Sequence, residues 1–228
     1  MPMTVRSAAR GTLRRCSRHS QPSRERAHRQ AAQPEPARFP EMTADTAQNY
    51  YEKLKPRIHR RIGQEVRLAY RVLDLGCGSC DLVRYLAESY RQEVTGVDIS
   101  DGSFPSRRHT GDGGHYHCLK QDAAHLSFAK DASADAIVSM WAMHEMAKPE
   151  AILSEAHRIL RPGGKIFIVD FPRDSIAQRL WNEDYYRPGD IESLLQNAGF
   201  EQVQGRVIEQ GQVMWSRGCR PPSSKGES

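Results

Sequence analysis

The sequence predicts an α/β protein with a doubly wound, mostly parallel, seven-stranded sheet that ends in an antiparallel hairpin. Short apolar runs alternate with segments of helical periodicity between residues 71 and 197, which is the pattern of a parallel sheet with crossover helices. A glycine-rich turn follows the first of these runs directly. The last two strand-like segments are separated only by Glu209–Gly211, so we expect them to pair as a hairpin.

The individual elements follow from this alternation. Residues 46–68 have apolar side chains at three- and four-residue steps, which predicts an N-terminal helix kinked at Pro56. The predicted strands are residues 71–75, 93–99, 115–120, 134–140, 165–171, 201–208 and 212–216, and the further helices are residues 81–90, 149–160 and 188–197. Five glycines and prolines between residues 101 and 114 predict an irregular loop where this scheme would otherwise place a helix.

Charge divides the 228-residue chain into two parts. Residues 1–40 hold nine arginines, no lysine and two acids, a net charge of +7. The remaining 24 basic and 26 acidic residues give a net charge of −2, so the basic character does not extend to the predicted domain, and we expect no nucleic-acid partner. We also expect no membrane insertion, because no apolar run approaches the length of a bilayer span.

We therefore expect a disordered leader at residues 1–41, a single domain at residues 42–218 and a disordered tail at residues 219–228. The arginine-rich leader is compatible with a mitochondrial transit peptide. It is equally compatible with translated sequence upstream of a start at Met42, which is the interpretation we favour. The protein is then expected in the cytoplasm, or in mitochondria if the leader is a transit peptide, and its oligomeric state is not indicated.

Five cysteines, an odd number at irregular spacing, do not form the framework of a disulfide-stapled domain and favour a reducing compartment; they are Cys16, Cys77, Cys80, Cys118 and Cys219. Cys77 and Cys80 between a strand and a helix also fit a redox pair, although the chain has too many parallel elements for a thioredoxin fold. A zinc site is not expected, since no second cysteine pair exists.

Functional residues are sought at the carboxyl ends of the strands, where open parallel sheets bind ligands. The first strand ends in Asp74-Leu75-Gly76-Cys77-Gly78, whose glycines allow a ligand to approach the backbone closely. The second ends in Asp98, a carboxylate able to accept both hydroxyls of a ribose, and the third leads to Asp122, which could accept an adenine amino group. Together these residues predict a nucleoside site.

Four segments resemble the successive motifs of class I methyltransferases, and they are residues 72–78, 96–100, 121–123 and 158–164. The similarity spans about residues 46–216 and is greatest to small-molecule enzymes of the ubiquinone and menaquinone type. It implies a Rossmann-like fold and S-adenosyl-L-methionine as the cofactor. The implied cofactor-binding residues are Asp74, Gly76, Cys77, Gly78, Asp98, Ile99, Asp122, Ala123 and Ser139, with Asp74 and the glycine turn at the methionine end.

Two features of the glycine turn bear on this resemblance. Cys80 replaces the third glycine of the family pattern, and its β-carbon could crowd the cofactor. The alternative function is therefore that of a non-catalytic protein of the same fold that binds S-adenosylmethionine or a nucleoside. Asp81 stands where a nicotinamide dinucleotide site needs its last glycine, and its carboxylate would repel phosphates. S-adenosylmethionine has no phosphate and carries a positively charged sulfonium, so nearby carboxylates would not repel it.

The acceptor is expected to be a small molecule bordered by residues 139–146. His144 in this segment is the candidate general base, because the pKa of histidine lies near neutrality. Bracing the loop is an equally good interpretation of this side chain. Several aromatic residues could line the acceptor pocket, although most such rings belong to the core; they are Tyr50, Tyr51, Trp141, Phe171, Trp181, Tyr185 and Tyr186.

Overall fold

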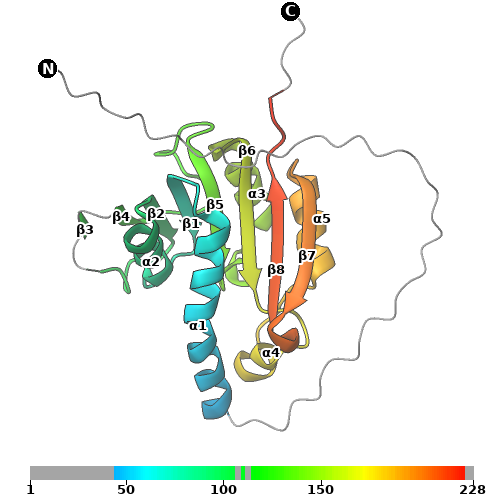
Figure 1. Cartoon of the computed structure of the whole chain (residues 1–228). Helices are drawn as coiled ribbons and strands as arrows, with labels where there is room; N and C mark the ends of the chain where they lie inside the picture. The colour runs from blue at the N-terminus through cyan, green and yellow to red at the C-terminus, as the bar shows by residue number, and fades with distance from the viewer. Residues whose placement is uncertain (1–43, 106–108, 111–113, 224–228) are drawn as a thin grey trace, which may run out of the picture.

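An eight-stranded sheet forms the middle layer of the computed structural model (Figure 1). The structure describes residues 44–105, 109–110 and 114–223, so the predicted leader lies outside the described residues. The strands are β1 (Arg71–Leu75), β2 (Glu93–Asp98), β3 (His109–Thr110), β4 (His115–Lys120), β5 (Ala134–Met140), β6 (Leu160–Asp170), β7 (Glu201–Ile208) and β8 (Val213–Cys219). Their order across the sheet is β3-β4-β2-β1-β5-β6-β8-β7.

Strand pairing confirms the predicted fold class. β4, β2, β1, β5 and β6 pair in parallel, while β8 pairs antiparallel with both β6 and β7. β7 and β8 are the predicted terminal hairpin, but β8 inserts between β6 and β7. The two-residue β3 adds an antiparallel edge strand within the segment predicted to be an irregular loop. The chain reverses its direction across the sheet between β1 and β5, which is where this architecture binds ligands.

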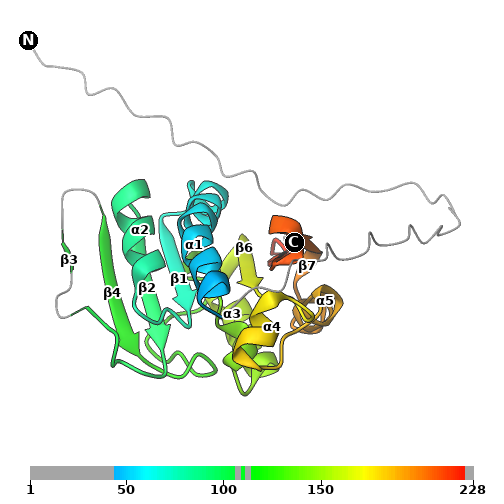
Figure 2. The same ribbon diagram turned by 90° about the horizontal axis from the view of Figure 1, so that it is seen from below.

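Helices cover both faces of the sheet, and Figure 2 shows α1 and α2 side by side on one of them. The helices are α1 (Ala44–Val66), α2 (Asp81–Tyr90), α3 (Pro149–Ile159), α4 (Ile176–Trp181) and α5 (Pro188–Asn197), with 3-10 turns η1 (Met143–Glu145) and η2 (Glu209–Gly211). The six-residue α4 was not predicted, because it is too short to produce a periodic pattern. None of the helices in the described ranges combines the length and apolarity of a bilayer span.

Alternating side chains of the strands divide the core into two clusters. Phe167 and Val169 of β6 pack with the inner faces of α1, α2 and α4, whereas Ile166 and Ile168 pack with α3 and α5. Both sets are at most 1% exposed. A strand that buries both of its faces reads as a continuous apolar run, which explains why the sequence located the central strands well.

The folded region extends beyond the predicted boundary at residue 218. β8 runs to Cys219, whose position is paired with Lys165 of β6. The guanidinium of Arg220 then donates hydrogen bonds to the carbonyl oxygens of Arg158 and Leu160. These backbone contacts hold the chain after the last strand.

Candidate functional site

A pocket of about 220 Å³ opens at the carboxyl ends of the parallel strands, next to the reversal between β1 and β5. Five of the residues predicted to bind the cofactor line it, and they are Gly76, Asp98, Ile99, Asp122 and Ala123. Asp98 ends β2 and Asp122 lies in the loop after β4, and both line this one cavity. The structure therefore brings together the two acids on which the predicted nucleoside site depends.

The turn after β1 is held against the end of β2 by its own amides. The N–H groups of Gly76 and Cys77 both donate to the carbonyl oxygen of Val97, at 2.8 and 3.0 Å. Gly76 has a φ of +74°, and a β-carbon there would lie 2.4 Å from the β-carbon of Ala142. A glycine is thus required at this position both by the backbone conformation and by the close approach of the loop after β5.

Asp98 and Asp122 also shape the loops that carry them. One oxygen of Asp98 accepts the N–H of Gly78 at 2.9 Å and the other accepts the N–H of Ser100 at 3.0 Å. Asp122 accepts the N–H of Ala124 at 2.9 Å. Each carboxylate oxygen has a second lone pair, so these backbone bonds fix the carboxylates and leave them able to accept from a ligand.

An apolar lining accompanies the acids, although the described residues between Asp98 and β4 form no helix. Ile99 is 75% exposed, which is unusual for so large an apolar side chain. It lines the pocket together with Val97, Met146 and Ile152. This combination of apolar walls and convergent acids suits a flat, polar-edged ring such as adenine.

The remaining predicted cofactor residues are not among those lining the pocket. Asp74 is 2% exposed, and its Oδ1 has no hydrogen-bond partner among the described residues. Burial and the negative charge of Asp98 raise the pKa of Asp74 well above its ordinary value. Ser139, at the end of β5, is likewise buried with a hydroxyl that has no partner within the described chain. Cys77 is 8% exposed and packs in the core beside α2.

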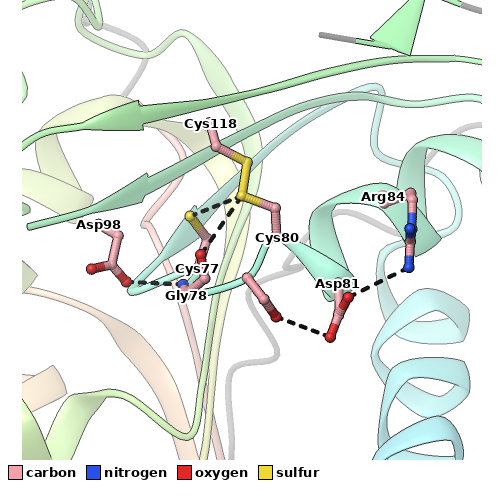
Figure 3. The surroundings of a disulfide bond; sticks show 8 residues. Cys77, Gly78, Cys80, Asp81, Arg84, Asp98 and Cys118 are labelled. Carbon is pink, nitrogen blue, oxygen red and sulfur yellow. Dashed lines mark hydrogen bonds and ion pairs between the residues drawn. A yellow bond between two sulfur atoms is a disulfide. The ribbon is translucent and has the colours of Figure 1, made fainter. Parts of the chain in front are cut away.

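Cys80 forms a disulfide with Cys118, which joins the start of α2 to β4 (Figure 3). This pairing differs from both cysteine hypotheses, the reduced thiols and the Cys77–Cys80 redox pair. Cys77 remains a thiol 3.7 Å from the sulfur of Cys80, and burial raises its pKa instead of lowering it. Cys80 is 1% exposed and lies outside the pocket lining, so its β-carbon does not crowd this cavity.

His144 lies in a polar cluster next to the pocket, and its side chain is 4% exposed. Its Nδ1 is 2.8 Å from Oδ1 of Asp170, and its Nε2 is 3.0 Å from Oε2 of Glu183. Burial lowers the pKa of His144, but the hydrogen bond and charge of Asp170, together with two glutamates, outweigh it and raise the pKa. Sequence reasoning missed Asp170 and Glu183; the position of Asp170 at the carboxyl end of β6 was the signal available for it.

The aromatic residues proposed to line an acceptor pocket mostly pack against one another. The rings of Tyr51, Phe171 and Tyr185 are buried, and the ring centres of Tyr51 and Phe171 are 4.8 Å apart. The hydroxyl of Tyr51 accepts the N–H of Ala177 and contacts the amide oxygen of Gln212. These three rings therefore belong to the core, whereas Trp181 at the end of α4 is 37% exposed.

Comparison with known proteins agrees with this geometry. Residues 73–168 match the model of a family described as a methyltransferase domain. A fatty-acid O-methyltransferase of Mycolicibacterium smegmatis is 36% identical over 140 residues, which are 59% of this chain and 49% of that protein. A ubiquinone biosynthesis O-methyltransferase of Idiomarina loihiensis is 33% identical over 108 residues, 46% of this chain and 43% of that protein. The chain thus spans about half the length of these relatives.

Among solved structures, a putative methyltransferase of Haloferax volcanii, in complex with the Trm112 methyltransferase activator, superposes with a TM-score of 0.60 at 18% identity. The superposition covers 77% of this chain and 95% of that one. At this identity the likeness concerns the fold. Residues 73–168 thus match a methyltransferase domain, and the fold around them is that of solved S-adenosylmethionine-dependent methyltransferases.

Proposed function

We propose that this protein transfers a methyl group from S-adenosylmethionine to a small-molecule acceptor. The observation that carries the proposal is that Asp98 at the end of β2 and Asp122 after β4 line one pocket beside the turn at Gly76. The acids have no lysine or arginine ion pair among the described residues, so their charge is available to a ligand. A sulfonium cofactor adds positive charge to a site in which buried Asp74 lies close to Asp98.

The residues present fit S-adenosylmethionine. Asp98 would accept the ribose hydroxyls, Asp122 the adenine amino group, and the unpartnered oxygen of buried Asp74 the ammonium of the methionine end. The bound cofactor supplies a methyl group on a sulfonium, ready for in-line attack. Holding the acceptor on that line provides most of the rate enhancement that such a reaction needs, because charge is neutralised as the methyl group moves.

A small molecule with an oxygen nucleophile is the acceptor class that we favour. Two relatives carry the names fatty-acid O-methyltransferase and ubiquinone biosynthesis O-methyltransferase. The net charge of residues 41–228 is −2, which does not favour a nucleic acid as the acceptor. Phenolic and carboxylic oxygens are therefore the first groups to test.

The alternative is a protein that binds the nucleoside without turnover, and it was suggested by Cys80. The disulfide of Cys80 with Cys118, and the position of Cys80 outside the pocket lining, favour the enzyme over this alternative. Calorimetry on the full chain with S-adenosylmethionine and S-adenosylhomocysteine separates the two functions when it is followed by a screen of phenols and carboxylic acids. Methyl transfer to any of them supports the enzyme, while tight binding without transfer across the screen supports the alternative.

The elevated pKa of Asp74 predicts proton release when the cofactor binds. An ammonium beside the carboxylate stabilises its charged form, so the affinity for S-adenosylmethionine should rise with pH up to the raised pKa, by at most about tenfold per pH unit. The same raised pKa makes the cofactor-free fold less stable as pH rises through it. Asp74→Asn should abolish both dependences.

Calorimetry in two buffers with different ionisation enthalpies measures the protons released. Asp81→Asn is the matched control, because Asp81 is paired with Lys55 at the surface and should leave proton release unchanged. If the observed binding enthalpies were equal in the two buffers, binding would release no net proton, and Asp74 would not change its protonation state.

A further inference from the structure

We propose that His144, Glu145 and Glu183 form a binding site for a divalent transition-metal cation next to the cofactor pocket. One ligand atom from each of these residues lies within 4.8 Å of those from the other two. The ligands come from η1 after β5 and from the segment after α4, so no local spacing in the sequence indicates the site. Its chemistry of one imidazole and two carboxylates is the set that Mn²⁺, Fe²⁺ and Zn²⁺ accept.

The cluster carries more negative charge than its one histidine can balance. Asp170 and Glu183 lie 2.8 and 3.0 Å from the two ring nitrogens of His144, and Glu145 lies 3.7 Å from Nε2. Among the residues that the structure describes, neither glutamate forms an ion pair with a lysine or arginine. A protonated imidazole offsets only one of the three carboxylate charges, whereas a divalent cation bound to the neutral imidazole would offset two of them.

Asp170 orients the imidazole as a metal ligand requires. Its Oδ1 faces Nδ1 of His144 and also accepts the N–H of Phe171, while its Oδ2 accepts the backbone N–H of His144. With the Nδ1 proton donated to Asp170, the lone pair of Nε2 points at the two glutamates. Metal-binding histidines almost always have their other nitrogen fixed by a carboxylate in this way.

The distances from Nε2 to the two glutamate oxygens are close to the edges of a coordination polyhedron. With metal–ligand bonds of about 2.1 Å, two ligands at a right angle are separated by about 3.0 Å and tetrahedral neighbours by about 3.4 Å. The separations of 3.0 and 3.7 Å from Nε2 to the glutamate oxygens therefore need only small side-chain adjustments. Glu145 and Glu183 are 68% and 45% exposed, so a cation can enter from solvent and retain water ligands.

The position of the site suggests its use, and this step rests on the proposed function. Glu145 also lines the cofactor pocket, so a cation bound to it lies at the border between cofactor and acceptor. A hydroxyl oxygen of the acceptor that binds the cation loses its proton more readily, to water or to a glutamate. That oxygen would then form the new bond to the methyl carbon of the bound cofactor, whose carbon–sulfur bond would break with its electron pair returning to sulfur. His144 acts here as a ligand and no longer as the general base.

Binding of Mn²⁺ to the full chain, followed by electron paramagnetic resonance, tests the site directly. We expect one bound ion with nitrogen hyperfine coupling from His144, and a loss of affinity of at least tenfold in Glu183→Gln. Asp170→Asn should weaken binding by about 10- to 100-fold through misorientation of the imidazole. Glu88→Gln, an exposed change on α2, is the matched control and should bind Mn²⁺ like the unmodified protein.

The outcomes separate this inference from the proposed function. Equal Mn²⁺ affinity in Glu183→Gln and Glu88→Gln, or bound Mn²⁺ without nitrogen coupling, would overturn the metal site even if methyl transfer is observed. Site-specific Mn²⁺ binding without transfer to any acceptor would leave the metal site in place and count against the enzyme. Because Glu183 is partly exposed, its replacement by glutamine is not expected to disturb folding.

Discussion

Asp98→Ala should weaken the binding of S-adenosylmethionine by about 10²- to 10⁴-fold. The substitution removes a carboxylate that would accept two ribose hydroxyls, and a hydrogen bond to a charged group contributes roughly 1.5–3 kcal/mol. It also frees the N–H of Gly78, which Asp98 holds at 2.9 Å, and so loosens the turn that approaches the cofactor. Both effects act on binding, and isothermal titration calorimetry measures their sum.

Asp101→Ala is the matched control for this experiment. Asp101 is three positions further along the same loop, is 58% exposed at its side chain and forms an ion pair with Lys120. It does not line the pocket, so its removal should change cofactor affinity by less than about threefold. If both variants bound the cofactor equally well, the assignment of Asp98 to the ribose would be wrong.

Thermal unfolding distinguishes lost contacts from a lost fold. Without cofactor, Asp98→Ala should remain cooperative in its unfolding, because the core strands around it are fixed by apolar packing on both faces. The unmodified protein should gain stability with added cofactor, and the variant should gain little at the same concentration. A variant that is unfolded before any ligand is added would instead require Asp98→Asn, which keeps the shape of the side chain.

Features that depend on consecutive residues could be predicted from the sequence. A strand buried on both faces and followed by a glycine turn can be recognised from consecutive residues, and β1 with its turn was placed at the observed positions. Asp98 and Asp122 could also be predicted to meet, since the carboxyl ends of parallel neighbours lie at one edge of a sheet. The short elements α4 and β3 were not predicted, because they contain too few residues to show a periodic pattern of apolar side chains.

Contacts between distant segments could not be predicted in the same way. Glu183 reaches His144 only because the chain after α4 returns across the end of β5, which depends on how β6, α4 and α5 pack. The role of His144 depends in turn on Asp170, a residue whose direction is set by its place at the end of β6. Pairing of Cys80 with Cys118 likewise needs β4 beside α2, a neighbourhood created by the sheet order.

The disulfide should make one of the largest contributions to the stability of the domain. Cys80 and Cys118 are separated by 38 positions, and a cross-link that closes a loop of this length stabilises a fold by up to about 4 kcal/mol through the entropy of the unfolded chain. Breaking it should lower the free energy of unfolding by about 2–4 kcal/mol. Denaturant unfolding followed by circular dichroism measures this difference.

The free thiol of Cys77, next to the disulfide, determines which variants can be compared. Cys77 lies 3.7 Å from the sulfur of Cys80 and could replace Cys118 as its partner once Cys118 is removed. The informative pair is therefore Cys77→Ala against Cys77→Ala/Cys118→Ala, in which Cys80 keeps its observed partner in the first protein and has lost both neighbouring cysteines in the second. Peptide mapping under non-reducing conditions identifies the bond in the first of these proteins. Equal unfolding free energies, with the Cys80–Cys118 peptide present, would mean that native-state strain cancels the entropic gain; absence of that peptide would mean that the two sulfurs do not pair.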